Sequence, residues 1–252
     1  MTQPQTLPML PENWDRCLAV AAHPDDIEYG TASAIARWTG QGKQVAYLLV
    51  TRGEAGIDSV PPEQAAPLRE REQRAGAAQV GVSELEFLDY RDGVIEGGLA
   101  LRRDIARAIR RLRPEVVVTG AFEVRINGYT NQADHRVVGL ATLDAARDAG
   151  NRWVFPELVD EGFAPWGGVR YVCVAGGGQP THGVDVTGRH LERGIASLAE
   201  HREYTAGLGG DGPDPAAFLT WAARRAGPAL GVEAAVLFDV YTLIPDEPPP
   251  WL

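Results

Sequence analysis

The first residues that can do chemistry together lie near the N-terminus, in the stretch AAHPDDIEYG. His23, Asp25 and Asp26 place one imidazole and two carboxylates within four positions. Imidazole nitrogen and carboxylate oxygen are common ligands of catalytic metal ions. Aspartates at this spacing also cap helices, because their oxygens accept hydrogen bonds from the free N–H groups of a first helical turn. The stretch alone therefore predicts either a metal site or a helix cap.

A second group follows more than a hundred residues later, in the stretch NQADHR. Asp134 and His135 open a helical pattern there. His23, Asp26 and His135 together supply two nitrogen ligands and one oxygen ligand, and three protein ligands with an open fourth position is the arrangement of catalytic zinc. Because the set contains no sulfur, Fe²⁺, Co²⁺ and Mn²⁺ also fit it. Among these ions we prefer Zn²⁺, but the residues do not select it.

Short apolar runs alternate with helical patterns along the chain. Strands are expected at 17–22, 45–50, 86–88, 116–118, 169–175 and 234–243, and helices at 29–38, 67–80, 99–113, 186–204 and 215–225. This alternation predicts an α/β fold, a Rossmann-like, doubly wound and mostly parallel sheet with helices on both faces. Ligands of such sheets bind beyond the carboxyl ends of the strands, where the strand order reverses. We therefore expect His23, after the first strand, to face His135, after the fourth.

Composition limits the class of protein. The chain has 252 residues, 44% of them hydrophobic and 23% charged, which is enough for one core. We expect a single domain over residues 1–252, with an irregular lead-in at 1–15 and a proline-rich tail at 245–252. The net charge of −10 argues against a nucleic-acid partner. With no signal-peptide pattern and no long apolar stretch, we expect a cytoplasmic protein without membrane insertion.

Three stretches together resemble the PIG-L/LmbE family of zinc-dependent N-acetylglucosaminyl de-N-acetylases. They are AHPDDIEYG after the first strand, TRGEAG after the second and DHR after the fourth. The similarity extends from His23 to about His201. It implies a metal-dependent hydrolase that removes an acetyl group from an N-acetylated amino sugar or its conjugate. It also implies a small-molecule substrate, and by analogy a homo-oligomer.

The resemblance assigns roles to the residues at both strand ends. His23, Asp26 and His135 match the metal ligands, and Asp25 matches the general base that takes a proton from a metal-bound water. One position departs from the family pattern, since Gln132 stands where relatives often have a histidine. An amide donates a hydrogen bond to an oxyanion but delivers no proton.

The leaving amine must then take its proton from another group, and two sources are open. Either His182, in QPTHGVDVT, enters the pocket, or Asp25 returns the proton that it took as a base. An exposed loop position is the competing interpretation of His182.

Five further residues are expected at the substrate. Arg52 and Glu54 lie in the TRGEAG loop, while Arg69 and Asp92 match positions that contact the sugar in relatives. Surface ion pairing is the alternative for Arg69 and Asp92. Asp134, next to a ligand, is expected either to support the metal site or to hydrogen-bond within the pocket.

Two other functions remain open on the sequence. The same metal site would serve an amidase that acts on a thiol conjugate. The departure at Gln132 also suits a protein that binds a sugar or nucleotide without turnover, although the chain lacks a G-x-G-x-x-G stretch after the first strand.

Overall fold

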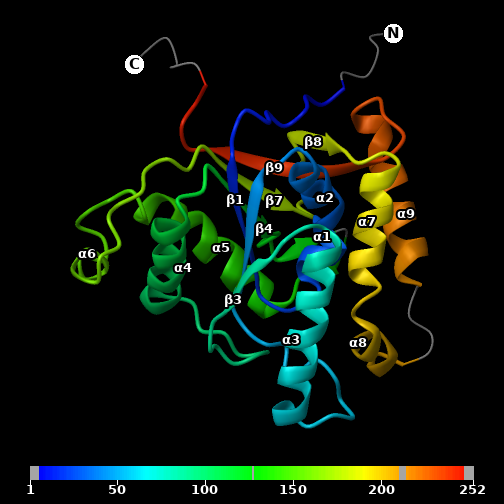
Figure 1. Cartoon of the computed structure of the whole chain (residues 1–252), viewed down its shortest axis with the longest axis horizontal. Coiled ribbons are helices and arrows are strands. Elements are labelled where there is room, and N and C mark those ends of the chain that lie inside the picture. Colours follow the sequence, from blue (N-terminus) through cyan, green and yellow to red (C-terminus); the bar gives the residue numbers. More distant parts are fainter. Residues whose placement is uncertain (1–5, 127, 210–213, 247–252) are drawn as a thin grey trace.

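A seven-stranded sheet forms the centre of the computed structural model, which describes residues 6–126, 128–209 and 214–246 (Figure 1). The strand order is β3-β2-β1-β4-β7-β9-β8. The strands are β1 (Arg16–Ala21), β2 (Gln44–Leu49), β3 (Glu84–Phe87), β4 (Val116–Gly120), β7 (Tyr171–Ala175), β8 (His182–Asp185) and β9 (Ala235–Thr242). β5 (Arg125–Ile126) and β6 (Tyr129–Thr130) form a separate small hairpin.

The sheet is mostly parallel, as expected. β1, β2, β3, β4 and β7 run in parallel, and β9 pairs antiparallel with both β7 and β8. β1 lies between β2 and β4, so the strand order reverses there. The expected doubly wound α/β fold is confirmed, with the reversal between the first and the fourth strand.

Helices cover both faces of the sheet. They are α1 (Asp26–Gly30), α2 (Ala32–Gly40), α3 (Pro62–Gln79), α4 (Leu99–Leu112), α5 (Ala133–Asp148), α6 (Glu157–Asp160), α7 (Arg189–Leu198), α8 (Arg202–Gly207) and α9 (Pro215–Ala226), with a short 3-10 turn at Gly227–Ala229. Figure 1 shows α4 and α5 on one side and α2, α7 and α9 on the other. Among the described residues, no helix has the length and hydropathy needed to cross a bilayer.

Strand β1 is buried on both faces, which explains its nearly continuous apolar sequence. Cys17, Ala19 and Ala21 belong to the core on the α2 side, while Leu18 and Val20 belong to the core on the α4–α5 side. Successive side chains of a strand point to opposite faces, so a central parallel strand needs apolar residues at every position.

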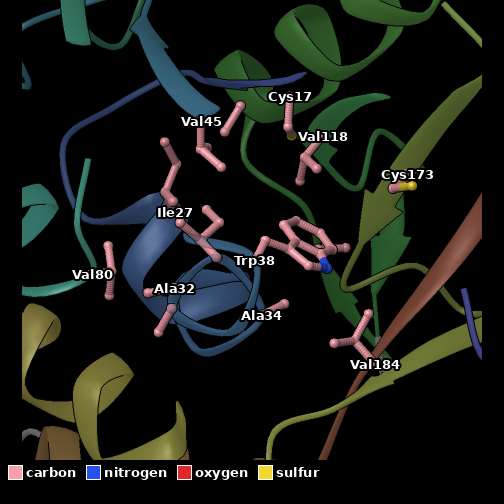
Figure 2. Close-up of a cluster of buried hydrophobic side chains, with 14 of the residues drawn as sticks. Cys17, Ile27, Ala32, Ala34, Trp38, Val45, Val80, Val118, Cys173 and Val184 are labelled. Carbon is pink, nitrogen blue, oxygen red and sulfur yellow. The ribbon is translucent and has the colours of Figure 1, made fainter. Parts of the chain in front are cut away.

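The core on the α2 side is built around Trp38 (Figure 2). Its side chain is fully buried and packs edge-on against Trp14, with the ring centroids 5.2 Å apart. The indole Nε1 donates a hydrogen bond of 3.0 Å to Glu12 Oε1. The lead-in therefore contributes Trp14 to the core, and Met9 forms a bridge with Gly183. Most of the expected tail, residues 247–252, lies outside the described part of the chain.

The structure corrects three expected boundaries. The helix expected at 186–204 is two helices, α7 and α8, separated at His201, whose side chain is fully buried between them and α3. The helix expected from residue 29 begins at Asp26 as α1 and breaks at Thr31, whose hydroxyl donates back to the Ile27 carbonyl. The helix expected from Pro67 begins at Pro62, because a proline is also well placed at that first turn.

Candidate metal centre

A cavity of about 430 Å³ opens at the carboxyl ends of β1 and β4. Its walls come from the β1–α1 turn, α3, the first turn of α5 and α8. The polar residues lining it include the following: His23, Asp25, Asp26, Arg69, Asp92, Gln132 and His135. The two segments that the sequence places after the first and fourth strands therefore meet in one cavity.

Three side chains in this cavity converge on one point. His23 Nδ1 lies 3.3 Å from His135 Nε2 and 3.5 Å from Asp26 Oδ2. His135 Nε2 lies 3.1 Å from Asp26 Oδ1. One donor atom from each residue lies within 4.8 Å of the others, as a shared metal ion requires. Two nitrogens and one oxygen form a donor set that fits Zn²⁺, Fe²⁺, Co²⁺ or Mn²⁺.

The opposite edge of the His23 ring is held by two carboxylates. His23 Nε2 lies 3.0 Å from Asp92 Oδ1 and 3.3 Å from Asp134 Oδ2. Asp134 is 1% exposed, and its two oxygens accept the backbone N–H groups of Gly93 at 2.7 Å and Ile95 at 3.1 Å. A carboxylate behind a ligand imidazole fixes the tautomer and the orientation of the ring. Asp92 and Asp134 thus hold His23 with Nδ1 toward Asp26 and His135.

His23, Asp92 and Asp134 form a second group whose donor atoms lie close enough for an ion. We prefer the first group for two reasons. Both oxygens of Asp134 already accept backbone hydrogen bonds, and the first group contains two imidazoles rather than one.

Asp25 stands beside the three converging side chains and is 4% exposed. Its backbone has φ 85° and ψ −22°, in the left-handed region, which costs a non-glycine residue on the order of 1–3 kcal/mol. Two contacts hold it there: Arg69 Nη2 donates to Asp25 Oδ1 at 3.0 Å, and the Asp25 N–H donates to Gln73 Oε1 at 2.9 Å. Burial raises the pKa of Asp25 to about 7, although Arg69 opposes the shift.

The charges around the cavity favour a cation. Burial lowers the pKa of His23, but the carboxylates of Asp26 and Asp92 outweigh it and raise the pKa to about 11. The pKa of His135 is also raised, because Asp26 outweighs the effect of burial. The pKa of Asp26 is lowered despite burial, because it faces both imidazoles. Both rings therefore lie in a strongly negative environment that attracts a divalent cation.

A comparison with known proteins identifies the family of this chain. The family model described as PIG-L: GlcNAc-PI de-N-acetylase matches residues 18–146, which is just over half of the chain. The match includes both segments that line the cavity. The chain belongs to the PIG-L family.

Two relatives indicate the range of this family. A diacetylchitobiose deacetylase from Thermococcus kodakarensis is 30% identical over 137 residues, covering 54% of this chain and 50% of its own. A 1D-myo-inositol 2-acetamido-2-deoxy-alpha-D-glucopyranoside deacetylase from Kineococcus radiotolerans is 32% identical over 173 residues, covering 54% and 48%. This PIG-L chain therefore spans about half the length of the curated relatives it matches.

The fold is shared over a longer stretch than the sequence. The structure of N,N'-diacetylchitobiose deacetylase from Pyrococcus horikoshii, in complex with an inhibitor, superimposes with a TM-score of 0.81 and 22% identity. The superposition covers 92% of this chain and 85% of the other. At this identity the likeness shows the fold alone.

Arg69 lines the cavity of this PIG-L protein, but its donors are largely engaged by the protein. Nη1 donates to the Gly53 carbonyl, and Nη2 donates to Pro24 and Asp25. Its guanidinium lies 3.8 Å from the centre of the Tyr204 ring. Arg69 therefore braces Asp25, and Asp92 and Asp134 brace His23.

Arg52 and Glu54 do not line the cavity. Arg52 pairs with Glu70 and Asp89 on the outer side of the loop. Glu54 Oε1 accepts the backbone N–H of Asp92 at 2.9 Å, so it shapes the loop behind His23.

Gln132, the residue in place of the family histidine, and the candidate proton source His182 occupy different places. Gln132 occupies the N-cap position of α5 without a side-chain capping hydrogen bond, and it lines the cavity. His182 begins β8, the edge strand that stands three positions from β4, or roughly 14 Å at ordinary strand spacing. Its Nδ1 lies 3.0 Å from Thr181 Oγ1, outside the cavity. The structure thus does not bring His182 to the metal centre, because β8 and β9 extend the sheet away from β4.

Sequence reasoning missed three residues of this site. Tyr29 and Tyr204 line the cavity, and Gln73 holds the backbone of Asp25. A usable signal existed for Gln73 only: it follows Arg69 by four residues, so the two share one face of α3. Tyr204 comes from α8, which the sequence merges with the preceding helix.

Proposed function

We propose that this protein is a metal-dependent hydrolase that removes the acetyl group from an N-acetylated amino sugar or from a conjugate of one. The observation that carries the proposal is the convergence of His23, Asp26 and His135 beside Asp25 in one cavity. Deacetylase names among the relatives support the reaction, and their N-acetylglucosamine derivatives support the substrate class.

In the proposal, His23 Nδ1, one oxygen of Asp26 and His135 Nε2 hold the ion. When bound, a divalent ion of this type acts as a Lewis acid on the amide carbonyl and brings the pKa of a water to about 7. Asp92 and Asp134 keep the His23 ring in the tautomer that leaves Nδ1 free to bind.

Asp25 is the proposed general base. It takes a proton from the attacking water as the C–O bond forms, and a positioned base typically contributes about 10² to 10⁴ in rate. The Gln132 amide donates a hydrogen bond to the negative charge that develops on the carbonyl oxygen. Asp25 then returns its proton to the leaving nitrogen as the C–N bond breaks. The products are acetate and a free amine.

This sequence of proton transfers needs no histidine at position 132. Of the two proton sources that the sequence left open, Asp25 is the one retained, because it lies in the cavity and His182 does not. Burial raises the pKa of Asp25, a shift in the direction that suits a group that both accepts and donates a proton near neutral pH.

The test is release of acetate and primary amine from N-acetylglucosamine and its short oligosaccharides. We expect turnover with Zn²⁺ supplied, loss of turnover after chelation and recovery when Zn²⁺ is returned. Turnover that chelation does not affect would contradict the proposal. Amine release only from thiol conjugates would favour the amidase, and tight sugar binding without any turnover would favour a binding protein.

A further inference from the structure

A row of buried polar side chains lies behind Asp25, on the side away from the cavity. Gln73 of α3 is 0% exposed and Glu28 of α1 is 1% exposed. They meet where α1 and α3 both pack against α7, three helices that Figure 1 shows close together. Burying polar groups of this kind is costly unless each finds a partner, so their partners indicate what they do.

Gln73 bridges Asp25 and Glu28. Its Oε1 accepts the backbone N–H of Asp25 at 2.9 Å, and its Nε2 donates to Glu28 Oε1 at 2.8 Å. A backbone N–H only donates, so the amide oxygen must face Asp25 and the amide nitrogen must face Glu28. The carboxylate of Glu28 therefore fixes which way the Gln73 amide points.

Helix α3 has a glycine, Gly76, at the point where it approaches α7 and Glu28. At Gly76, a Cβ atom would lie 3.0 Å from the Ser197 carbonyl oxygen and 3.3 Å from Glu28 Oε1. Ser197 Oγ also donates to the Gly76 carbonyl at 2.7 Å. The absence of a side chain at Gly76 lets α3 approach α7 closely and brings Gln73 within reach of Glu28.

Asp25 thus has two separate anchors. Arg69 holds the carboxylate and Gln73 holds the main chain. Without an acceptor for its buried N–H, the left-handed backbone of Asp25 would lose the contact that offsets its strain. A return to an ordinary φ would move the carboxylate away from Arg69 and from its present place in the cavity.

We propose that Gln73 is a positioning residue for Asp25, and that Glu28 acts through Gln73 by fixing the orientation of its amide. The proposal rests on the proposed function, in which Asp25 is the base. Gln73 does not line the cavity, so we expect it to affect turnover rather than the binding of substrate or metal.

The test compares Gln73→Met, Gln73→Glu and the exchanged pair Gln73→Glu/Glu28→Gln. Gln73→Met removes the acceptor, and Gln73→Glu places a second carboxylate against Glu28. The exchanged pair restores both hydrogen bonds, since a glutamate at position 73 accepts from Asp25 and from a glutamine at position 28. The matched control is Gln79→Met, an exposed position on the same helix whose amide donates to Glu200 at 2.8 Å.

We expect each single change at Gln73 to lower kcat by roughly 10- to 100-fold, with KM and bound Zn²⁺ close to wild type, as for other residues that orient a catalytic group. The exchanged pair should recover most of the lost kcat, and Gln79→Met should match wild type. A second readout needs no activity: the Asp25 amide should exchange its hydrogen faster in metal-free Gln73→Met than in metal-free wild type.

Wild-type kcat in Gln73→Met, or no recovery in the exchanged pair, would overturn the proposal. So would a loss of turnover that follows a loss of bound Zn²⁺. If the wild type releases no amine, the proposed function fails, and the Asp25 amide exchange alone then decides whether Gln73 holds this backbone.

Discussion

Replacing Asp134 with asparagine tests whether Asp134 orients the metal ligand His23 or binds substrate. The asparagine keeps the shape of the side chain but has one acceptor oxygen instead of two. In the structure, the two oxygens of Asp134 face three donors: the N–H groups of Gly93 and Ile95 and the Nε2 of His23. Asp134→Asn therefore leaves at least one buried donor facing an NH₂ group.

The magnitude follows from these contacts. A buried donor without an acceptor costs about 1–3 kcal/mol. For a chain of this length, about 2 kcal/mol lowers Tm by roughly 4–8 °C. Loss of the carboxylate behind His23 should also weaken metal binding by about 10- to 100-fold, which is the usual effect of removing a partner of a ligand histidine.

The assays are thermal unfolding of the metal-free protein and competition of each variant with a Zn²⁺ indicator. The matched control is Asp144→Asn on the same helix, where the carboxylate is 45% exposed and lies 3.8 Å from Arg102. We expect this control to change stability by less than about 0.5 kcal/mol. The reasoning is refuted if Asp134→Asn keeps wild-type Tm and Zn²⁺ affinity and raises only KM for the sugar, because Asp134 would then bind substrate.

Three further changes test other parts of the account. Asp25→Asn should retain Zn²⁺ while kcat falls by about 10² to 10⁴, and retained turnover measured by amine release would remove Asp25 from its role. His182→Ala should leave kcat within about twofold of wild type, since β8 stands three strands from β4; a large drop would return His182 to the mechanism. Gly139→Ala should destabilise the fold by about 1–3 kcal/mol in urea unfolding, because its Cβ would lie 2.6 Å from the Gly120 carbonyl oxygen, and unchanged stability would show that α5 shifts freely on β4.

The sheet and the meeting of its strand ends were predictable from periodicity. β1 is apolar at successive positions because helices cover both of its faces, and the same holds for β4. Once β1 and β4 are adjacent parallel strands, the residues that follow them must reach the same edge. The approach of His23 to His135 therefore follows from topology and needs no detailed packing.

The direction of individual side chains was not predictable in the same way. Asp92 was expected at the substrate, and Asp134 either behind the metal site or as a hydrogen-bond partner in the pocket. In the structure both carboxylates face His23. Their orientation depends on the path of the loop at 91–95, whose backbone N–H groups bind Asp134. No periodic pattern encodes that path, since a loop is held by specific hydrogen bonds rather than by an apolar face.

The edge of the sheet was hard to foresee for another reason. β8 has only four residues, HGVD, and its signal is too short to distinguish a strand from a loop. The antiparallel pairing of β8 with β9 decides that His182 lies away from β4. The position of this short edge strand thus places His182 away from the metal centre.

The most direct test of the metal centre is the Zn²⁺ stoichiometry of metal-stripped wild type beside His135→Ala, measured by calorimetric titration. The convergence of His23, Asp26 and His135 predicts one tightly bound ion per chain in the wild type and its loss in the variant. Equal Zn²⁺ binding by both proteins, or none by the wild type, would contradict the claim that these three residues hold a metal.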